Sequence, residues 1–413
     1  MTTKNSLVNK RFAWYRFVLS FAIVFLLSIK LNAQDRDRGE VRDSDFEYEV
    51  IVIHKTGPDS NRVKLAYASD GYTSDEIDAF PGHVKESVYY LQTPGMYVRP
   101  LPRYKNFINI YRAELLSEES GISIAPRYGR DKTKTVRNAL GGSRDEDRLG
   151  WVDRSLAGIF FEQVAESIGV DKINWPFVVL NNPEYHNSGG RFVVFSYNYG
   201  KEIGLHEAGH GFFDLADEYY SEGNFTKDEP RNVNVTADST GAKWFEWMAY
   251  TDIDTALGVI DVYEGAMYAS RGAYRPTENS KMGWTSDKKP VSFNAVCRQK
   301  IILDIYNIID PVDDAMETGV VHIRPEEIWL KVIDPRVLLV DWYVNGKLVK
   351  ENGGQTFKPD EYIYEPGSYI IKAHVYDEVV KHAFSDNSNP HPLDLVRKNL
   401  DKLQQEIEWK VKL

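Results

Sequence analysis

The sequence predicts two structured parts of different fold class, an α/β part over residues 46–308 and an all-β part over residues 309–413. Up to about residue 308, apolar runs of strand length alternate with longer segments whose apolar residues recur at helical spacing. From Pro311 onward, the pattern changes to short alternating runs that are separated by turn residues. A length of 413 residues also exceeds what one small domain needs.

The α/β part is predicted to contain a mixed, twisted sheet. Its expected strands are 48–54, 63–69, 107–112, 176–181 and 191–197. One helix is expected to open within residues 73–76, where a hydroxyl side chain caps the first turn. A second helix is expected over 156–168 and is closed by Gly169. A third helix, which carries the candidate site, directly follows the last of these strands.

The all-β part has the pattern of an immunoglobulin-like β-sandwich. Its expected strands are 329–332, 338–344, 362–364, 368–375 and 408–411. Asn345-Gly346 and Pro366-Gly367 supply turns between strands. A helix is expected to interrupt the strands over 395–407. The aromatic residues Trp342 and Tyr343 lie on one of these strands. They could form a core or a glycan-binding platform, and the core is the favoured interpretation.

Residues 1–33 have the features of a secretory signal peptide. A basic front that ends at Arg16 precedes the apolar run 17–29, and Ala33 offers a small residue for cleavage. The run is too short for a comfortable bilayer span, and an uncleaved amino-terminal anchor is the alternative. The polar residues 34–45 are predicted to form a linker. We therefore expect an exported protein, in the periplasm, on the cell surface or in the medium, without a stable membrane span after cleavage.

The charge and the cysteine content restrict the partners and the stabilising chemistry. The formal net charge is −11, and removal of residues 1–33, which hold five basic residues and no acid, would change it to −16. A strongly acidic protein is a poor partner for nucleic acid or an anionic membrane. The sequence has one cysteine, Cys297, so no intramolecular disulfide can form. The stability of an exported protein without a disulfide depends on its hydrophobic core or on a bound metal. Cys297 is predicted to be a buried small side chain and not a reactive thiol.

His206, Glu207 and His210 form the pattern with the clearest chemical meaning. Two histidines four positions apart lie on one face of a helix, where both can bind one Zn²⁺ at about 2.0–2.1 Å. Glu207 adjoins the first histidine and can take a proton from water whose pKa zinc lowers to about 7. The alternative is a helix whose histidines face solvent. We predict one zinc ion per chain, bound by His206 and His210, with Glu207 as the catalytic base. The preceding strand is expected to be an edge strand to which an extended substrate adds.

The segment 206–219, which reads HEAGHGFFDLADEY, resembles the signature of the bacterial IgA-peptidase-like family of zinc metallopeptidases. Three further segments that are similar to that family lie at 69–73, 263–266 and 274–282. The resemblance covers about residues 60–300 and does not extend to the all-β part. It implies an α/β zincin with a metzincin-like catalytic domain, in which Met282 lies in a tight turn beneath the metal.

The third metal ligand is implied by the same resemblance. Metzincins place a glycine three residues after the second histidine and a ligand three residues later, but here those positions are Phe213 and Ala216. The family pattern shifts the acidic residue to Asp217. Because an uninterrupted helix would carry Asp217 roughly 10 Å along its axis from the second histidine, the helix must break near Phe213 for Asp217 to bind. Glu218 and Asp214 are the alternatives.

A donor for the developing oxyanion is the least determined part of the site. Many metzincins supply a tyrosine two residues past the methionine, but Trp284 stands at that position. Tyr219, Tyr274 and Arg275 are the remaining candidates.

Together, these features predict a secreted zinc-dependent endopeptidase that hydrolyses peptide bonds of proteins or glycoproteins. The alternative is a catalytically inactive, metal-stabilised adhesin or glycan-binding protein, which the departures at Phe213, Ala216 and Trp284 would suit. The sequence leaves the natural substrate and the oligomeric state open.

Overall fold

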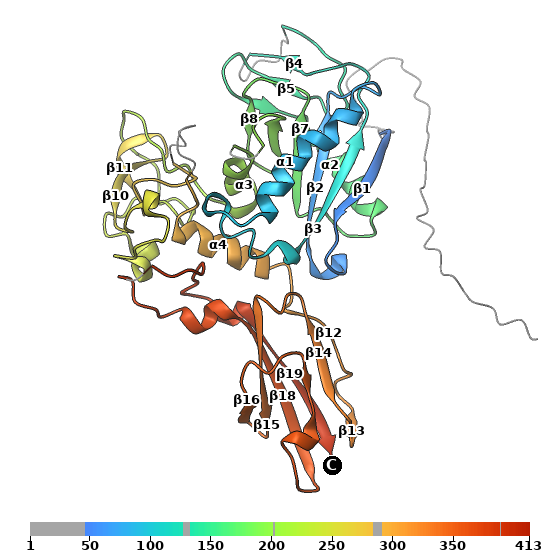
Figure 1. The fold of residues 1–413 in the computed structure, drawn as a ribbon. Coiled ribbons are helices and arrows are strands. Elements are labelled where there is room, and N and C mark those ends of the chain that lie inside the picture. Colours follow the sequence, from blue (N-terminus) through green and yellow to red (C-terminus); the bar gives the residue numbers. More distant parts are fainter. Residues whose placement is uncertain (1–45, 127–132, 201–202, 284–290, 389) are drawn as a thin grey trace, which may run out of the picture.

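The computed structural model describes residues 46–126, 133–200, 203–283, 291–388 and 390–413 (Figure 1). The predicted signal peptide (1–33) and linker (34–45) lie outside the described residues, and so does Trp284. Among the helices that are described, none is both long and apolar enough to span a bilayer.

A six-stranded mixed sheet forms the centre of the amino-terminal part (Figure 1). Its strands, in spatial order, are β1 (Tyr48–His54), β3 (Ile108–Leu115), β2 (Val63–Asp70), β7 (Trp175–Leu180), β9 (Val193–Ser196) and β8 (Asn187–Ser188). The run from β3 to β9 is parallel, whereas β1 and β8 pair antiparallel at the two edges. Each strand expected in this part overlaps an observed strand.

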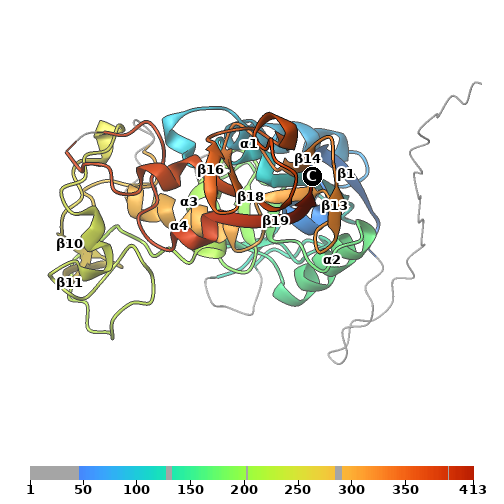
Figure 2. The same ribbon diagram turned by 90° about the horizontal axis from the view of Figure 1, so that it is seen from below.

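Helices cover both faces of this sheet, as Figure 2 shows for α1 and α2. The helices α1 (Phe80–Gln92), α3 (Ile203–Phe213) and α4 (Ala295–Tyr306) share one core with sheet residues such as Tyr67 and Phe177. On the other face, α2 (Arg154–Ser167) packs against Ala66 and Val178, which are adjacent in sequence to Tyr67 and Phe177. Successive side chains of a strand point to opposite faces, so each strand supplies both cores. The architecture of this part is α/β, as expected.

The strand that precedes α3 is not an edge strand. β9 pairs with β7 on one side and with β8 on the other, so the short β8 forms the edge. Asn187 of β8 also bridges to Leu149, which covers part of that edge. The expectation that residues 191–197 offer a free edge to a substrate is therefore wrong, because the chain before Gly189 folds back onto this strand.

The first helix begins later than expected. Residues 73–76 form a turn in which the Thr73 backbone N–H donates to the Glu76 carboxylate at 3.1 Å, and α1 starts only at Phe80. Pro81 explains the start, because proline is favoured in the first helical turn, where its missing N–H costs no hydrogen bond.

Two further sheets form the carboxy-terminal part (Figure 1). One contains β12 (Val312–Ala315), β14 (Ile328–Val332) and β17 (Thr356–Phe357). The other contains β13 (Val321–Ile323), β19 (Gln404–Lys412), β18 (Ser368–Asp377), β15 (Leu338–Val344) and β16 (Lys347–Lys350). Trp342 is fully buried and stacks on Trp409 with ring centroids 5.7 Å apart, so it belongs to the core. The immunoglobulin-like assignment and the boundary between residues 308 and 309 stay predictions.

The helix expected over 395–407 is not formed. Only a short 3₁₀ turn, Leu400–Leu403, occurs there, and Gln404 already begins β19. Residues 404–412 form a strand because they pair with β18 from Ser368 to Tyr376, and this pairing buries Trp409 and Val411 on one face of β19. The expected strand 362–364 is likewise replaced by irregular chain after the 3₁₀ turn Pro359–Glu361.

Asp377, at the end of β18, connects the carboxy-terminal sheets to the α/β part. Its fully buried carboxylate accepts hydrogen bonds from the hydroxyls of Tyr104 and Tyr306, each at 2.8 Å. Arg103 pairs with the same carboxylate at 2.9 Å. A buried carboxylate with this many donors is satisfied, and the network fixes the sheets against the α/β part.

Candidate metal centre

The helix α3 presents His206 and His210 side by side. Their Nε2 atoms are 3.2 Å apart and their ring planes are nearly perpendicular, at 89°. The Nδ1 atom of His206 lies 2.8 Å from the carbonyl of Lys281, and the Nδ1 atom of His210 lies 2.8 Å from the carbonyl of Leu215. A carbonyl only accepts, so each Nδ1 carries the hydrogen. In the neutral rings, both Nε2 lone pairs are then directed at a common point.

The chain after α3 turns back sharply and brings Asp217 to the same point. The helix ends at Phe213, and Asp214 takes the left-handed conformation with φ 50°. The Leu215 N–H closes the turn by donating to the Gly209 carbonyl at 2.9 Å. As a result, the Oδ1 atom of Asp217 lies 3.3 Å from the His206 Nε2 atom and 3.0 Å from the His210 Nε2 atom.

The two alternative acids do not join this group. Asp214 pairs with Arg231 at 2.8 Å, and its side chain is 45% exposed. Glu218 is buried on the other side of the chain, where it accepts hydrogen bonds from Asn234 at 2.8 Å and from Asn294 at 3.0 Å. Of the described residues, only His206, His210 and Asp217 form a group of three or more potential ligands, with all ligand atoms within 4.8 Å of one another.

A cation fits the space between these three atoms. The Asp217 Oδ1 atom is buried and has no hydrogen-bond donor, and the two Nε2 atoms beside it are also acceptors. Three acceptors this close repel one another unless a proton or a metal ion lies between them. Burial by itself lowers the pKa of His210, but the Asp217 carboxylate outweighs burial and raises that pKa to about 9 in the metal-free protein. A metal ion therefore competes with a proton for this site.

Glu207 follows His206 in the middle of α3, and its carboxylate lies against Gly189, in the chain that leads out of β8. Burial raises the pKa of its carboxyl group, while the Gly189 backbone N–H donates to it and opposes that rise. A Cβ atom at Gly189 would lie 2.8 Å from the Glu207 Oε2 atom and 2.9 Å from the His210 Cβ atom. Glycine at 189 is therefore what allows the backbone to approach the carboxylate.

Met282 lies directly beneath the helix. It is fully buried, and a Cβ atom at Gly209 would lie 2.4 Å from its sulfur atom. Its carbonyl accepts the Glu218 N–H at 2.7 Å, and the carbonyl of the preceding Lys281 is the partner of His206 Nδ1. This turn supports both the helix and the segment that carries Asp217.

Two tyrosine hydroxyls border the group of three. Tyr219 lies with its ring centroid 6.4 Å from that of His206, and its hydroxyl donates to the Tyr268 hydroxyl at 2.8 Å. The other two candidates are placed differently, since Arg275 donates to the carbonyls of its own hairpin and Tyr274 pairs with Thr236. Tyr268 could not be predicted from the sequence, because no local pattern indicates that the tip of a hairpin will pack against Asp217, 51 positions earlier in the chain.

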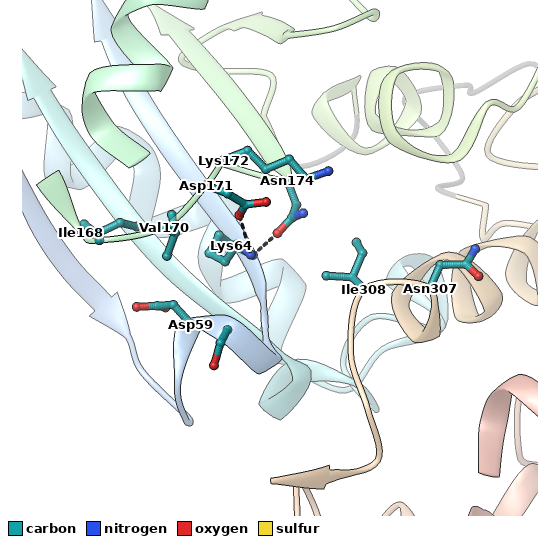
Figure 3. Close-up of a pocket in the computed structure, with 11 residues that line it drawn as sticks. Asp59, Lys64, Ile168, Val170, Asp171, Lys172, Asn174, Asn307 and Ile308 are labelled. Carbon is teal, nitrogen blue, oxygen red and sulfur yellow. Dashed lines mark hydrogen bonds and ion pairs between the residues drawn. The ribbon is translucent and has the colours of Figure 1, made fainter. Parts of the chain in front are cut away.

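A surface hollow of about 700 Å³ lies at the amino-terminal ends of β2 and β7, lined by residues that include Lys64, Asp171 and Asn174 (Figure 3). Lys64 and Asp171 form an ion pair across it at 3.8 Å. None of its lining residues belongs to the metal centre.

The model of the IgA peptidase M64 family matches residues 51–258, which is half of the chain and includes the segment from His206 to Asp217. The chain belongs to the IgA peptidase M64 family. This confirms the resemblance, and it makes the protein a metallopeptidase with a protein substrate. No curated protein matches the sequence. Tyr268, Met282 and the carboxy-terminal sheets of this M64 peptidase lie outside the matched residues.

Proposed function

We propose that this M64 peptidase is an exported, zinc-dependent endopeptidase in which Glu207 is the general base. The observation that carries the proposal is the convergence of three acceptor atoms from His206, His210 and Asp217. Tetrahedral zinc with bonds of about 2.0–2.1 Å holds its ligand atoms about 3.3 Å apart. The separations here are 3.2, 3.3 and 3.0 Å. Two imidazoles and one carboxylate also leave a fourth position for water or substrate, as in catalytic zinc sites.

The bound ion would supply a Lewis acid that polarises the scissile carbonyl and acidifies water to a pKa of about 7. Glu207 accepts the proton of the attacking water and delivers it to the leaving amine. Burial raises the pKa of Glu207 toward the working pH, which suits a group that must both accept and donate. The Tyr219 ring lies beside that of His206, and its hydroxyl could serve the developing oxyanion only by turning its one hydrogen away from the Tyr268 oxygen.

The substrate is a protein or glycoprotein segment in extended conformation. Because the edge at Asn187 is partly covered by Leu149, we place the substrate further along the same chain, beyond Gly189, whose backbone already contacts Glu207. A metzincin-like catalytic fold and an immunoglobulin-like carboxy-terminal domain belong to the same proposal. Support comes from the placement of Met282 beneath α3 and from the two packed sheets after residue 311.

An inactive adhesin gains no support from the site. The departures at Phe213 and Ala216 suit a lost ligand, but the turn at Asp214 brings the Asp217 carboxylate next to the two histidines. Of the two aromatic residues considered for glycan binding, Trp342 is fully buried and Tyr343 is partly buried.

Chelation tests the proposal directly. The purified protein, without residues 1–33, is expected to contain about one zinc ion per chain and to cut an unstructured protein substrate at internal bonds. Dialysis against a chelator is expected to abolish cleavage, and one equivalent of zinc is expected to restore it. Mass spectrometry of the fragments measures the cleavage. Cleavage that persists in protein shown to be free of metal would refute the proposal.

A further inference from the structure

The hairpin formed by β10 (Tyr263–Ala266) and β11 (Ala269–Arg275) packs its tip against the segment that carries Asp217. Figure 1 shows this hairpin beyond α3, on the side away from the six-stranded sheet. At the tip, the Met267 N–H donates to the Asp217 carbonyl at 3.0 Å, and the Tyr268 N–H donates to the Tyr219 carbonyl at 3.2 Å. The Ser221 hydroxyl donates to the Tyr268 carbonyl at 2.8 Å. The tip is thus fixed to the candidate ligand segment through backbone atoms.

This attachment places the Tyr268 hydroxyl on Asp217. The hydroxyl donates to Oδ2 at 2.6 Å, while Oδ1 of the same carboxylate faces the two histidines. The Tyr219 hydroxyl donates to the Tyr268 oxygen at 2.8 Å, which leaves the single hydroxyl hydrogen of Tyr268 for Asp217. The two oxygens of Asp217 therefore have separate partners, one a phenol and the other the imidazole pair.

The backbone of the tip has an unfavourable conformation, which the contacts around Tyr268 maintain. Met267 and Tyr268 both have positive φ values, 50° and 65°. A two-residue turn with two positive φ values normally takes Asn-Gly or Asp-Gly, because larger side chains are disfavoured there. Such residues persist only where surrounding contacts enforce the conformation.

We propose that Tyr268 is a positioning residue that orients the Asp217 carboxylate for metal binding. The proposal rests on the metal site described above and extends it to a residue outside the family match. A carboxylate held by one donor on Oδ2 cannot rotate freely, so Oδ1 stays directed at the point where the histidine Nε2 atoms converge. Outer partners of this kind change metal affinity or activity by 10–100-fold when they are removed.

The Tyr268→Phe variant tests this role, because it removes the hydroxyl and keeps the ring. We expect the apparent zinc dissociation constant, measured by competition with a chromophoric chelator, to rise 10–100-fold. The visible absorption of the cobalt-substituted protein is expected to change as well, since the orientation of one ligand changes. Tyr263→Phe is the matched control. It removes a hydroxyl of the same hairpin that donates to the Val259 carbonyl, at 3.0 Å, and not to Asp217. Zinc affinity of this variant should stay within twofold of the wild type.

A second variant separates positioning from general loss of folding. In an Asp217→Ala background, adding Tyr268→Phe is expected to change zinc affinity no further, because the two residues act through one contact. The thermal midpoint of the metal-free Tyr268→Phe protein should match that of Tyr263→Phe.

Wild-type zinc affinity in Tyr268→Phe, or an equal loss in Tyr263→Phe, would overturn the positioning role and leave the peptidase proposal standing. A wild-type protein that binds no zinc would overturn both.

Discussion

Glu207→Gln is expected to lower the turnover number by 10²–10⁴-fold while the protein still binds one zinc ion. Glutamine keeps the shape of the side chain and can still interact with the Gly189 N–H, but it cannot take a proton at neutral pH. Glu207 contributes no atom to the group of His206, His210 and Asp217, so metal content should not change. Turnover on a fluorogenic peptide and metal content by atomic emission should be measured on the same preparation.

Two other outcomes for Glu207→Gln would contradict the assignment. Loss of zinc would make Glu207 a ligand or a structural support. Retention of both zinc and full activity would assign the base to another residue. His206→Ala is the comparison variant, because it removes a ligand and should lose metal together with activity.

Asp217→Ala is expected to weaken zinc binding by more than the 10–100-fold that loss of an outer partner costs, and to abolish cleavage. The reason is that Oδ1 is the only carboxylate atom that faces both imidazoles among the described residues. Equilibrium dialysis against buffered zinc measures the effect. Asp214→Ala is the matched control, because it removes a neighbouring acid whose side chain is 45% exposed and pairs with Arg231. That variant should keep zinc and activity, and the reverse pattern would make Asp214 the third ligand.

The candidate ligands differed in how far the sequence could predict them. His206 and His210 follow from helical spacing alone, since residues four apart share a face. Asp217 required a break in the helix. Aspartate adopts a positive φ more readily than most non-glycine residues, but that preference is too weak to predict that Asp214 would do so at this point of the chain. Only the family resemblance favoured Asp217 over its neighbours. Tyr268 depends on how a distant hairpin packs, which neither spacing nor resemblance encoded.

The fold shows the same division between local and long-range information. Five strands of the six-stranded sheet were predictable, because each is a short apolar run bounded by turn residues. Which of them lies at the edge depends on pairing, and β8 has only two residues, too few to give a pattern. Residues 404–407 were assigned to a helix and form the start of β19, because partner strand β18 decides their conformation.

Anomalous diffraction at the zinc absorption edge, from crystals grown with zinc, tests the proposed metal site without relying on activity. We expect one strong peak per chain, at about 2.0–2.2 Å from His206 Nε2, His210 Nε2 and Asp217 Oδ1. Glu207 should approach the peak only through a water molecule. A peak bound by Glu218 or Asp214 in place of Asp217, or no peak between the two histidines in zinc-loaded protein, would refute the proposed zinc site.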